Sequence, residues 1–221
     1  MERRIIPAKE HRTEIRVVNS RFIASIAPAF SVEEARAFIQ RVKEEFADAS
    51  HNVPAYVIGH GASVTAHCND DGEPSGTAGR PALAVLQGSD LGDAAVVVTR
   101  YFGGTKLGTG GLVRAYGDAV RAVLAELPRA EKVATDVALL AVPYNLYEQA
   151  ALLVKAHRGL TMDTTFAADV TLTLQFRSGD LAPFNHALSE LSHGALEAEL
   201  VDSDDSTIMP LPNEDENDDG S

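Results

Sequence analysis

The most constraining feature of this sequence is the apolar run AAVVVTRYF at residues 94–102. A continuous run of this kind, rich in valine, is typical of a strand that is covered on both faces. Amphipathic helices are predicted around it, one from Ser31 to about residue 48 and a longer one that ends at Leu127. The sequence therefore predicts a central strand within an α+β domain.

Two glycine-rich polar loops bracket this strand and the short helix predicted before it. The first loop, Asn69–Pro81, reads NDDGEPSGTAGRP, and the second loop, Gly103–Gly111, reads GGTKLGTGG. Glycine permits positive φ angles or a close approach to the backbone, at a cost in conformational entropy. Two such loops in one domain suggest a surface built for recognition.

The second loop is a candidate anion site because it joins a strand to the start of a helix. Free backbone N–H groups and the positive end of the helix dipole converge there. We expect a phosphate of a nucleotide or of an RNA backbone to bind through the nearby basic side chains and glycines, which are Arg80, Arg100, Gly103, Gly104, Lys106, Gly108, Gly110, Gly111 and Arg114. The loop matches neither the P-loop nor G-x-G-x-x-G. A tight turn whose glycines pack against a neighbouring strand is the alternative interpretation.

The first loop offers a second group of polar side chains. Together with a histidine upstream, the group consists of His51, Asp70, Asp71, Glu73, Ser75 and Thr77. Adjacent carboxylates are able to hold Mg²⁺ or to act as a general base. The string DDGEPSG is also typical of a turn that caps the following helix, and we favour that interpretation. We therefore predict no catalytic residue, no metal and no cofactor.

Cysteine content and hydropathy indicate a cytoplasmic protein. Cys68 is the only cysteine, so an intrachain disulfide is excluded, and we expect its thiol to be half-buried and inert. The N-terminus has no apolar segment of the secretory type, and no run approaches the roughly 20 apolar residues that span a bilayer. We expect no membrane partner.

The net charge of −13 is distributed unevenly along the chain. Residues 1–132 have no net charge, whereas residues 133–201 carry −5 and residues 202–221 carry −8. A nucleic acid would therefore meet the N-terminal half. The acidic C-terminal segment is expected to solvate the chain or to serve as an interaction segment.

Beyond Leu127 the pattern of apolar residues predicts the order βαββαβ, which is that of a ferredoxin-like domain. Its sheet lacks the aromatic pattern with which such sheets stack RNA bases. The predicted parts are an N-terminal extension at 1–14, a first domain at 15–128, a linker at 129–135, a ferredoxin-like domain at 136–201 and a disordered acidic tail at 202–221.

The two loops and the strand between them resemble a known signature. The strings NDDGEPSGTAGRP and VVVTRYFGGTKLGTGGLVRAY are similar to the signature of the YigZ/IMPACT family, and His51-x-x-Pro-Ala-Tyr56 is similar to its H-x-C-x-A-Y element. Val53 stands at the cysteine position, which excludes a thiol there. The resemblance implies a ribosomal protein S5 domain 2-like fold for 16–127 and the C-terminal domain of bacterial members for 136–200. The pair resembles the fourth and fifth domains of elongation factor G.

The resemblance also implies a role in translation. Eukaryotic relatives regulate translation by binding a ribosome-associated activator of an initiation-factor kinase, and no catalytic activity is established for the family. We therefore expect a translation-associated regulatory protein that contacts RNA, the ribosome or a translation-regulatory partner. One alternative is an enzyme that binds a phosphorylated small molecule or a nucleotide through the Gly103–Gly111 loop, and another is a protein-interaction scaffold. The sequence indicates no oligomeric state.

Overall fold

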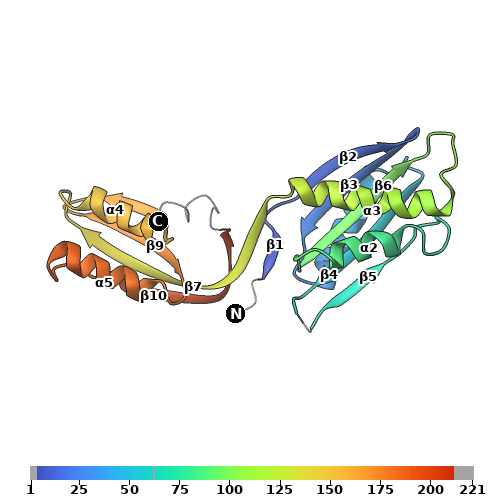
Figure 1. Ribbon diagram of the computed structural model, residues 1–221. Helices are drawn as coiled ribbons and strands as arrows, with labels where there is room; N and C mark the ends of the chain where they lie inside the picture. The colour runs from blue at the N-terminus through green and yellow to red at the C-terminus, as the bar shows by residue number, and fades with distance from the viewer. Residues whose placement is uncertain (1–3, 62, 212–221) are drawn as a thin grey trace, which may run out of the picture. The chain divides into compact units, whose positions relative to one another are not determined.

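The computed structural model describes residues 4–61 and 63–211, which form two compact units that divide between Glu131 and Lys132 (Figure 1). The elements of the first unit are β1 (Ile5–Pro7), β2 (His11–Val17), β3 (Ser20–Pro28), α1 (Val32–Glu45), β4 (His51–Ile58), β5 (Thr65–Cys68), α2 (Gly79–Gln87), β6 (Ala94–Tyr101) and α3 (Gly108–Glu126). Within the described ranges, no helix is long and apolar enough to cross a membrane.

The first unit is built on an antiparallel sheet with the strand order β2-β3-β6-β4-β5. Helix α1 packs on one face, and α2 and α3 lie side by side on the other (Figure 1). Ala95 and Val97 of β6 belong to the core under α1, whereas Val96 and Val98 point to the opposite face, and all are fully buried. The prediction of a central strand covered on both faces is confirmed.

Strands β2 and β3 form a hairpin that turns at Val18 and Asn19. The first domain was predicted to begin at residue 15. The hairpin begins earlier than predicted, at His11, and residues 5–7 form β1, so the described part of the predicted extension at 1–14 belongs to the fold. Alternate residues of β2 are exposed, and this polar edge strand therefore lacks a strong apolar signal.

The second unit has the ferredoxin-like order βαββαβ. Its elements are β7 (Arg129–Val142), α4 (Tyr147–Ala156), β8 (Leu160–Phe166), β9 (Val170–Arg177), α5 (Leu181–Ser192) and β10 (Glu199–Pro210). Strand β9 lies between β7 and β8, and β10 pairs with β7. Alternate residues of β7 and β9 meet the helices in one core, which includes Leu140, Leu172 and Phe184. The predicted ferredoxin-like domain is confirmed.

Two segments predicted to lie between or beyond the domains are strands instead. Strand β7 runs through the predicted linker at 129–135, because Arg129–Glu131 pair with β1 while Thr135 and later residues pair with β9. Strand β10 continues to Pro210 and buries Met209, although the disordered tail was predicted to begin at Asp202. An exposed edge strand needs few apolar residues, so its acidic sequence resembled disorder. Residues 212–221 of the predicted tail lie outside the described residues.

Candidate nucleic-acid interface

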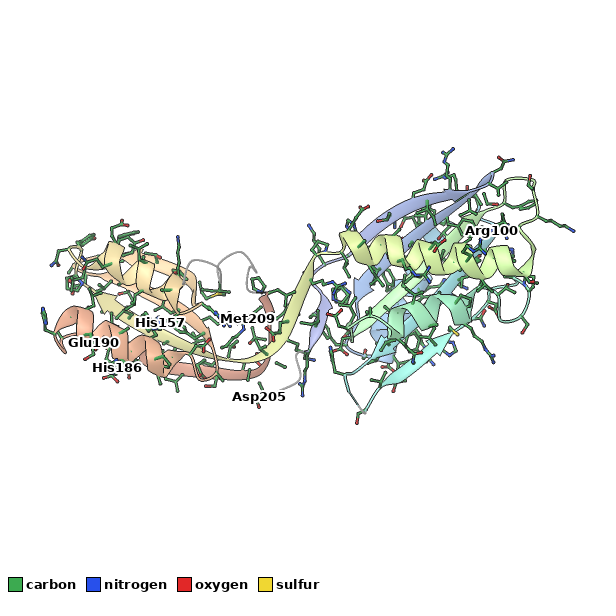
Figure 2. All side chains as sticks on the ribbon, viewed as in Figure 1. Arg100, His157, His186, Glu190, Asp205 and Met209 are labelled. Carbon is green, nitrogen blue, oxygen red and sulfur yellow. The ribbon has the colours of Figure 1, made fainter. Side chains whose placement is uncertain are left out.

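The two glycine-rich loops lie at the same end of the first unit's sheet. Strands β4 and β6 are antiparallel, and His51 at the start of β4 is opposite Arg100 near the end of β6. Strand β5 is antiparallel to β4, so Cys68, its last residue, leads the first loop towards that end. Figure 2 shows Arg100 at this end of the unit, where β6 passes into the second loop. Helices α2 and α3, which follow the loops, consequently begin close together.

A buried ion pair connects the first loop to β6. Glu73 Oε1 accepts hydrogen bonds from Arg100 Nη1 at 2.6 Å and from the Tyr116 hydroxyl at 2.8 Å. Arg100 is 5% exposed and Glu73 is 8% exposed, and His51 Nε2 lies 3.8 Å from the same carboxylate oxygen. Arg100 Nη2 also donates to Ser20 Oγ at 3.4 Å. The charge of Arg100 is therefore neutralised inside the fold.

The burial of Arg100 corrects its predicted place on an anion-binding surface. Residues alternate between the two faces of β6, and Arg100 falls on the face covered by α2 and α3. Burial, followed by the nearby Glu73 carboxylate, raises the pKa of Tyr116, so its hydroxyl stays protonated and donates a hydrogen bond. Tyr116 lies on the buried face of α3, and a buried tyrosine hydroxyl requires a partner. The need of the Tyr116 hydroxyl for a buried partner was the one indication in the sequence of the cluster formed by Glu73, Arg100 and Tyr116.

The adjacent carboxylates of the first loop hold the fold together. Asp70 accepts backbone hydrogen bonds from Gly76 at 2.8 Å, Ala78 at 3.1 Å and Gly79 at 2.8 Å. Asp70 thereby caps the start of α2, as the turn interpretation of the loop predicted. Partial burial raises the pKa of Asp70, but the hydrogen bonds from these backbone N–H groups outweigh this effect and leave the pKa below its usual value.

Asp71 joins the first loop to the α1 side of the sheet. Its Oδ1 forms an ion pair with Lys43 of α1, and its Oδ2 accepts a hydrogen bond from the Asn52 N–H at 2.7 Å. The His51 ring nitrogen Nδ1 lies 2.7 Å from the Asp71 carbonyl oxygen. Burial raises the pKa of Asp71, but the hydrogen bonds from Lys43 and from the Asn52 N–H outweigh this effect. The pKa is therefore lower than usual, and the carboxylate stays ionised.

The remaining polar residues of the first loop form no separate site. The Thr77 hydroxyl donates to the Pro74 carbonyl at 2.7 Å, and Ser75 is exposed. Burial, followed by the charge of Asp70, raises the pKa of the Cys68 thiol, which disfavours the reactive thiolate. Across the part of the chain that the structure describes, no three His, Cys, Asp or Glu residues gather as metal ligands. The carboxylates of this loop are committed to contacts within the protein.

The Asp70 cap leads to a prediction about acid stability. A carboxylate with a lowered folded pKa contributes stability above the unfolded value of about 3.9, and this contribution is lost as the pH falls towards the folded value. Asp70→Asn is therefore expected to cost about 1 kcal/mol at pH 7 and to flatten the loss of stability below about pH 4. Urea unfolding between pH 3 and pH 7 measures both effects. Asp118→Asn, on the exposed side of α3, is the control. An equal change of stability in both variants would contradict the capping role of Asp70.

The second loop contains two kinds of glycine. A Cβ on Gly103 would lie 1.9 Å from the Asn19 carbonyl oxygen, so Gly103 permits the close approach of the β2–β3 turn. A Cβ on Gly110 would meet nothing within 4 Å, and its φ is not positive. Packing therefore explains Gly103, as the alternative interpretation of the loop predicted, but leaves Gly110 without a structural reason. Around Gly110, no side chain of the described residues caps the start of α3.

The basic residues at this end of the sheet are exposed. Arg80 lies in the first turn of α2, Lys106 in the second loop and Arg114 in the second turn of α3. None of these three forms a hydrogen bond or an ion pair with another described side chain, and we call them the basic surface. Gly104, Gly108 and Gly110 are exposed beside Lys106 and Arg114.

Sequence reasoning missed a further source of positive charge near the second loop. Arg16 and Arg21 of the β2–β3 hairpin share a single carboxylate, that of Glu14. The contact between Gly103 and Asn19 brings this hairpin to the loop. Because the hairpin and the loop are more than 80 residues apart in the chain, no local pattern indicated their proximity.

Both units match known protein families. Residues 18–124 match the model of the Impact N-terminal domain, and residues 140–195 match a domain of unknown function, DUF1949. "IMPACT family member YigZ" of Escherichia coli is 37% identical over 198 residues, which are 89% of this chain and 97% of the relative.

A eukaryotic relative and a solved structure extend the comparison. "Protein IMPACT" of Xenopus laevis is 36% identical over 107 residues, which are 47% of this chain and 34% of the relative. A solved structure described as "Crystal structure of an hypothetical protein" is 36% identical and covers 91% of this chain and 98% of its own, with a TM-score of 0.59.

Proposed function

This chain belongs to the IMPACT family, and from that premise we propose that it is a translation-regulatory protein whose first unit binds the phosphate backbone of RNA. The family resemblance supports the connection with translation. The basic surface supports the contact with RNA. Under this proposal the protein acts in the cytoplasm, and its RNA partner is free or belongs to the ribosome.

One observation carries the proposal: at the shared end of the sheet, the carboxylates of the first loop bond to the protein itself, whereas the three side chains of the basic surface form no hydrogen bond or ion pair with another described side chain. Asp70, Asp71 and Glu73 each accept hydrogen bonds from the protein itself. The basic surface faces solvent and forms no ion pair with a described carboxylate, although the charge of Arg80 helps to lower the pKa of Asp70. A region of net positive charge results in a chain whose total charge is −13. Such a region attracts a polyanion.

The glycines suit this role because they allow the RNA backbone to come close. At Gly104, Gly108 and Gly110 a Cβ would meet nothing within 4 Å, so open space lies over this stretch. The N–H groups at the start of α3 lack a side-chain cap among the described residues and are available to a phosphate oxygen. Contacts of this kind position the RNA backbone and do not select its sequence.

Salt-dependent RNA binding tests the proposal. Lys106→Ala is expected to weaken the binding of a structured RNA by at least about tenfold, because a charge-assisted contact to a phosphate contributes about 1.5–3 kcal/mol. The slope of log K against log salt should also decrease by about 0.7–0.9 for the lost phosphate contact. Fluorescence anisotropy with a labelled RNA hairpin, at several salt concentrations, measures both quantities.

Arg114→Ala and Arg121→Ala form a matched pair for this experiment. Both arginines lie on α3, but Arg114 belongs to the basic surface whereas Arg121 is ion-paired with Asp118 further along the helix. Arg114→Ala should weaken RNA binding, and Arg121→Ala should leave it nearly unchanged. Binding that does not depend on salt, or no binding at micromolar protein, would overturn the proposal.

A further inference from the structure

Strand β4 contributes side chains to both faces of the sheet in the first unit. His51 reaches the buried ion pair on the face covered by α2 and α3. Pro54 and Tyr56 lie on the opposite face, under α1. The stretch from His51 to Tyr56 thus contributes side chains to two sites, one on each face of the sheet. The buried ion pair is only one of these sites.

The second place is a pocket between α1 and the β4–β5 edge of the sheet. Its volume is about 270 Å³, and we call it the α1 pocket. The polar and aromatic side chains that line it come from α1, β4 and β5, and they are Arg36, Gln40, Lys43, Tyr56 and His67. We propose that the α1 pocket binds a nucleoside monophosphate unit, with the base against His67 and the phosphate at Arg36.

Two neighbouring rings, tilted relative to each other, form one wall of the α1 pocket. Tyr56 and His67 are opposite each other on β4 and β5. Their ring centroids are 5.4 Å apart and their planes are inclined by 33°. Tyr56 is 5% exposed, whereas His67 is exposed. The imidazole is therefore a flat surface held in place by the tyrosine behind it, and a nucleic-acid base stacks on surfaces of this kind.

Helix α1 supplies the opposite wall. Arg36, Gln40 and Lys43 follow one another at intervals of four and three residues, which places them on one side of the helix. Lys43 is held by Asp71, and the Gln40 amide donates to Glu44 Oε1 at 2.8 Å. Arg36 forms no ion pair or hydrogen bond with another described side chain. Its guanidinium is therefore available for a phosphate.

Charge and size together define the ligand. Lys43 is neutralised by Asp71, which leaves Arg36 as the lining side chain whose positive charge has no ion-pair partner among the described residues, so an anion is favoured over a cation. The volume lies just below the range of about 300–1,000 Å³ that is usual for drug-sized ligands, which fits a single nucleotide rather than a dinucleotide cofactor. Two sources share this chemistry, a free mononucleotide and an unpaired nucleotide of an RNA strand. For the RNA source, the inference rests on the proposed function.

Titration of the full chain with AMP, measured by isothermal calorimetry, tests whether the α1 pocket binds a nucleotide. Arg36→Ala is expected to weaken AMP binding about tenfold, through loss of the phosphate contact. His67→Ala should weaken it to a similar extent, and His67→Phe should restore it because the flat surface returns. The matched control is Arg41→Ala, since Arg41 is exposed on the same helix, pairs with Glu10 and does not line the pocket.

Binding experiments with RNA distinguish this inference from the proposed function. Arg36→Ala should weaken the binding of a single-stranded RNA and leave that of a blunt-ended RNA duplex unchanged, whereas Lys106→Ala should weaken the binding of the duplex and of the hairpin and leave AMP binding unchanged. If the hairpin does not bind but AMP does, the proposed function fails and the pocket stands. The inference is overturned if AMP does not bind at millimolar concentration, if Arg36→Ala and Arg41→Ala behave alike, or if inorganic phosphate competes as well as AMP.

Discussion

Glu73→Ala is expected to lower the free energy of unfolding of the first unit by about 3–5 kcal/mol. The change leaves the Arg100 guanidinium and the Tyr116 hydroxyl buried without their common acceptor. A buried charge that has lost its partner carries the full cost of its removal from water. Thermal and urea unfolding of the full chain measure the effect, which should also appear as a large decrease in melting temperature.

Two further variants show whether burial of the ion pair causes this effect. Asp118→Ala breaks an exposed ion pair with Arg121 and should change the stability by no more than about 0.5–1 kcal/mol. The double variant Glu73→Leu with Arg100→Met removes both charges together and should recover much of the stability lost in Glu73→Ala. If Glu73→Ala costs no more than Asp118→Ala, the pair does not stabilise the fold as its burial requires.

Gly103→Ala and Gly110→Ala are expected to have opposite effects on stability, although both positions belong to the second loop. A Cβ on Gly103 would overlap the Asn19 carbonyl oxygen, so backbone must move, at a cost of about 3 kcal/mol. A Cβ on Gly110 meets nothing within 4 Å, and alanine is the better helix former by about 0.5–1 kcal/mol. Melting temperatures of the two variants provide the comparison.

RNA binding by Gly110→Ala then separates the structural from the functional glycine. The variant should be more stable than the parent protein but bind RNA more weakly, because its methyl group occupies the space over the start of α3. Stability and binding normally change together when a substitution disrupts a fold. A Gly110→Ala variant that binds RNA as well as the parent protein does would show that the phosphate backbone does not approach at this point.

Local patterns were sufficient for much of the fold. The valine-rich run of β6 indicated a strand buried on both sides, and it lies at the centre of its sheet. The order of strands and helices after Leu127 indicated the ferredoxin-like unit. These signals succeed because burial on one or both faces imposes a period on apolar residues, and that period is visible in the chain.

Polar edge strands were predicted only in part, for the same physical reason. Strands β2 and β10 bury little, so their sequences show no strong apolar period. They form strands because a neighbouring strand supplies hydrogen-bond partners, β3 for one and β7 for the other. The acidic residues of β10 therefore suggested disorder, although the segment up to Pro210 is paired.

The sequence alone was enough to identify the two loops, the basic residues among them and the family signature. Only the tertiary structure decided which of these charges face solvent. Arg100 and Lys106 lie six residues apart and both suggested an anion site, yet Arg100 is paired with Glu73 in the interior and Lys106 is exposed. The physical reason is that a charge becomes available or neutralised through contacts between segments distant in the chain, and local spacing carries no record of those contacts.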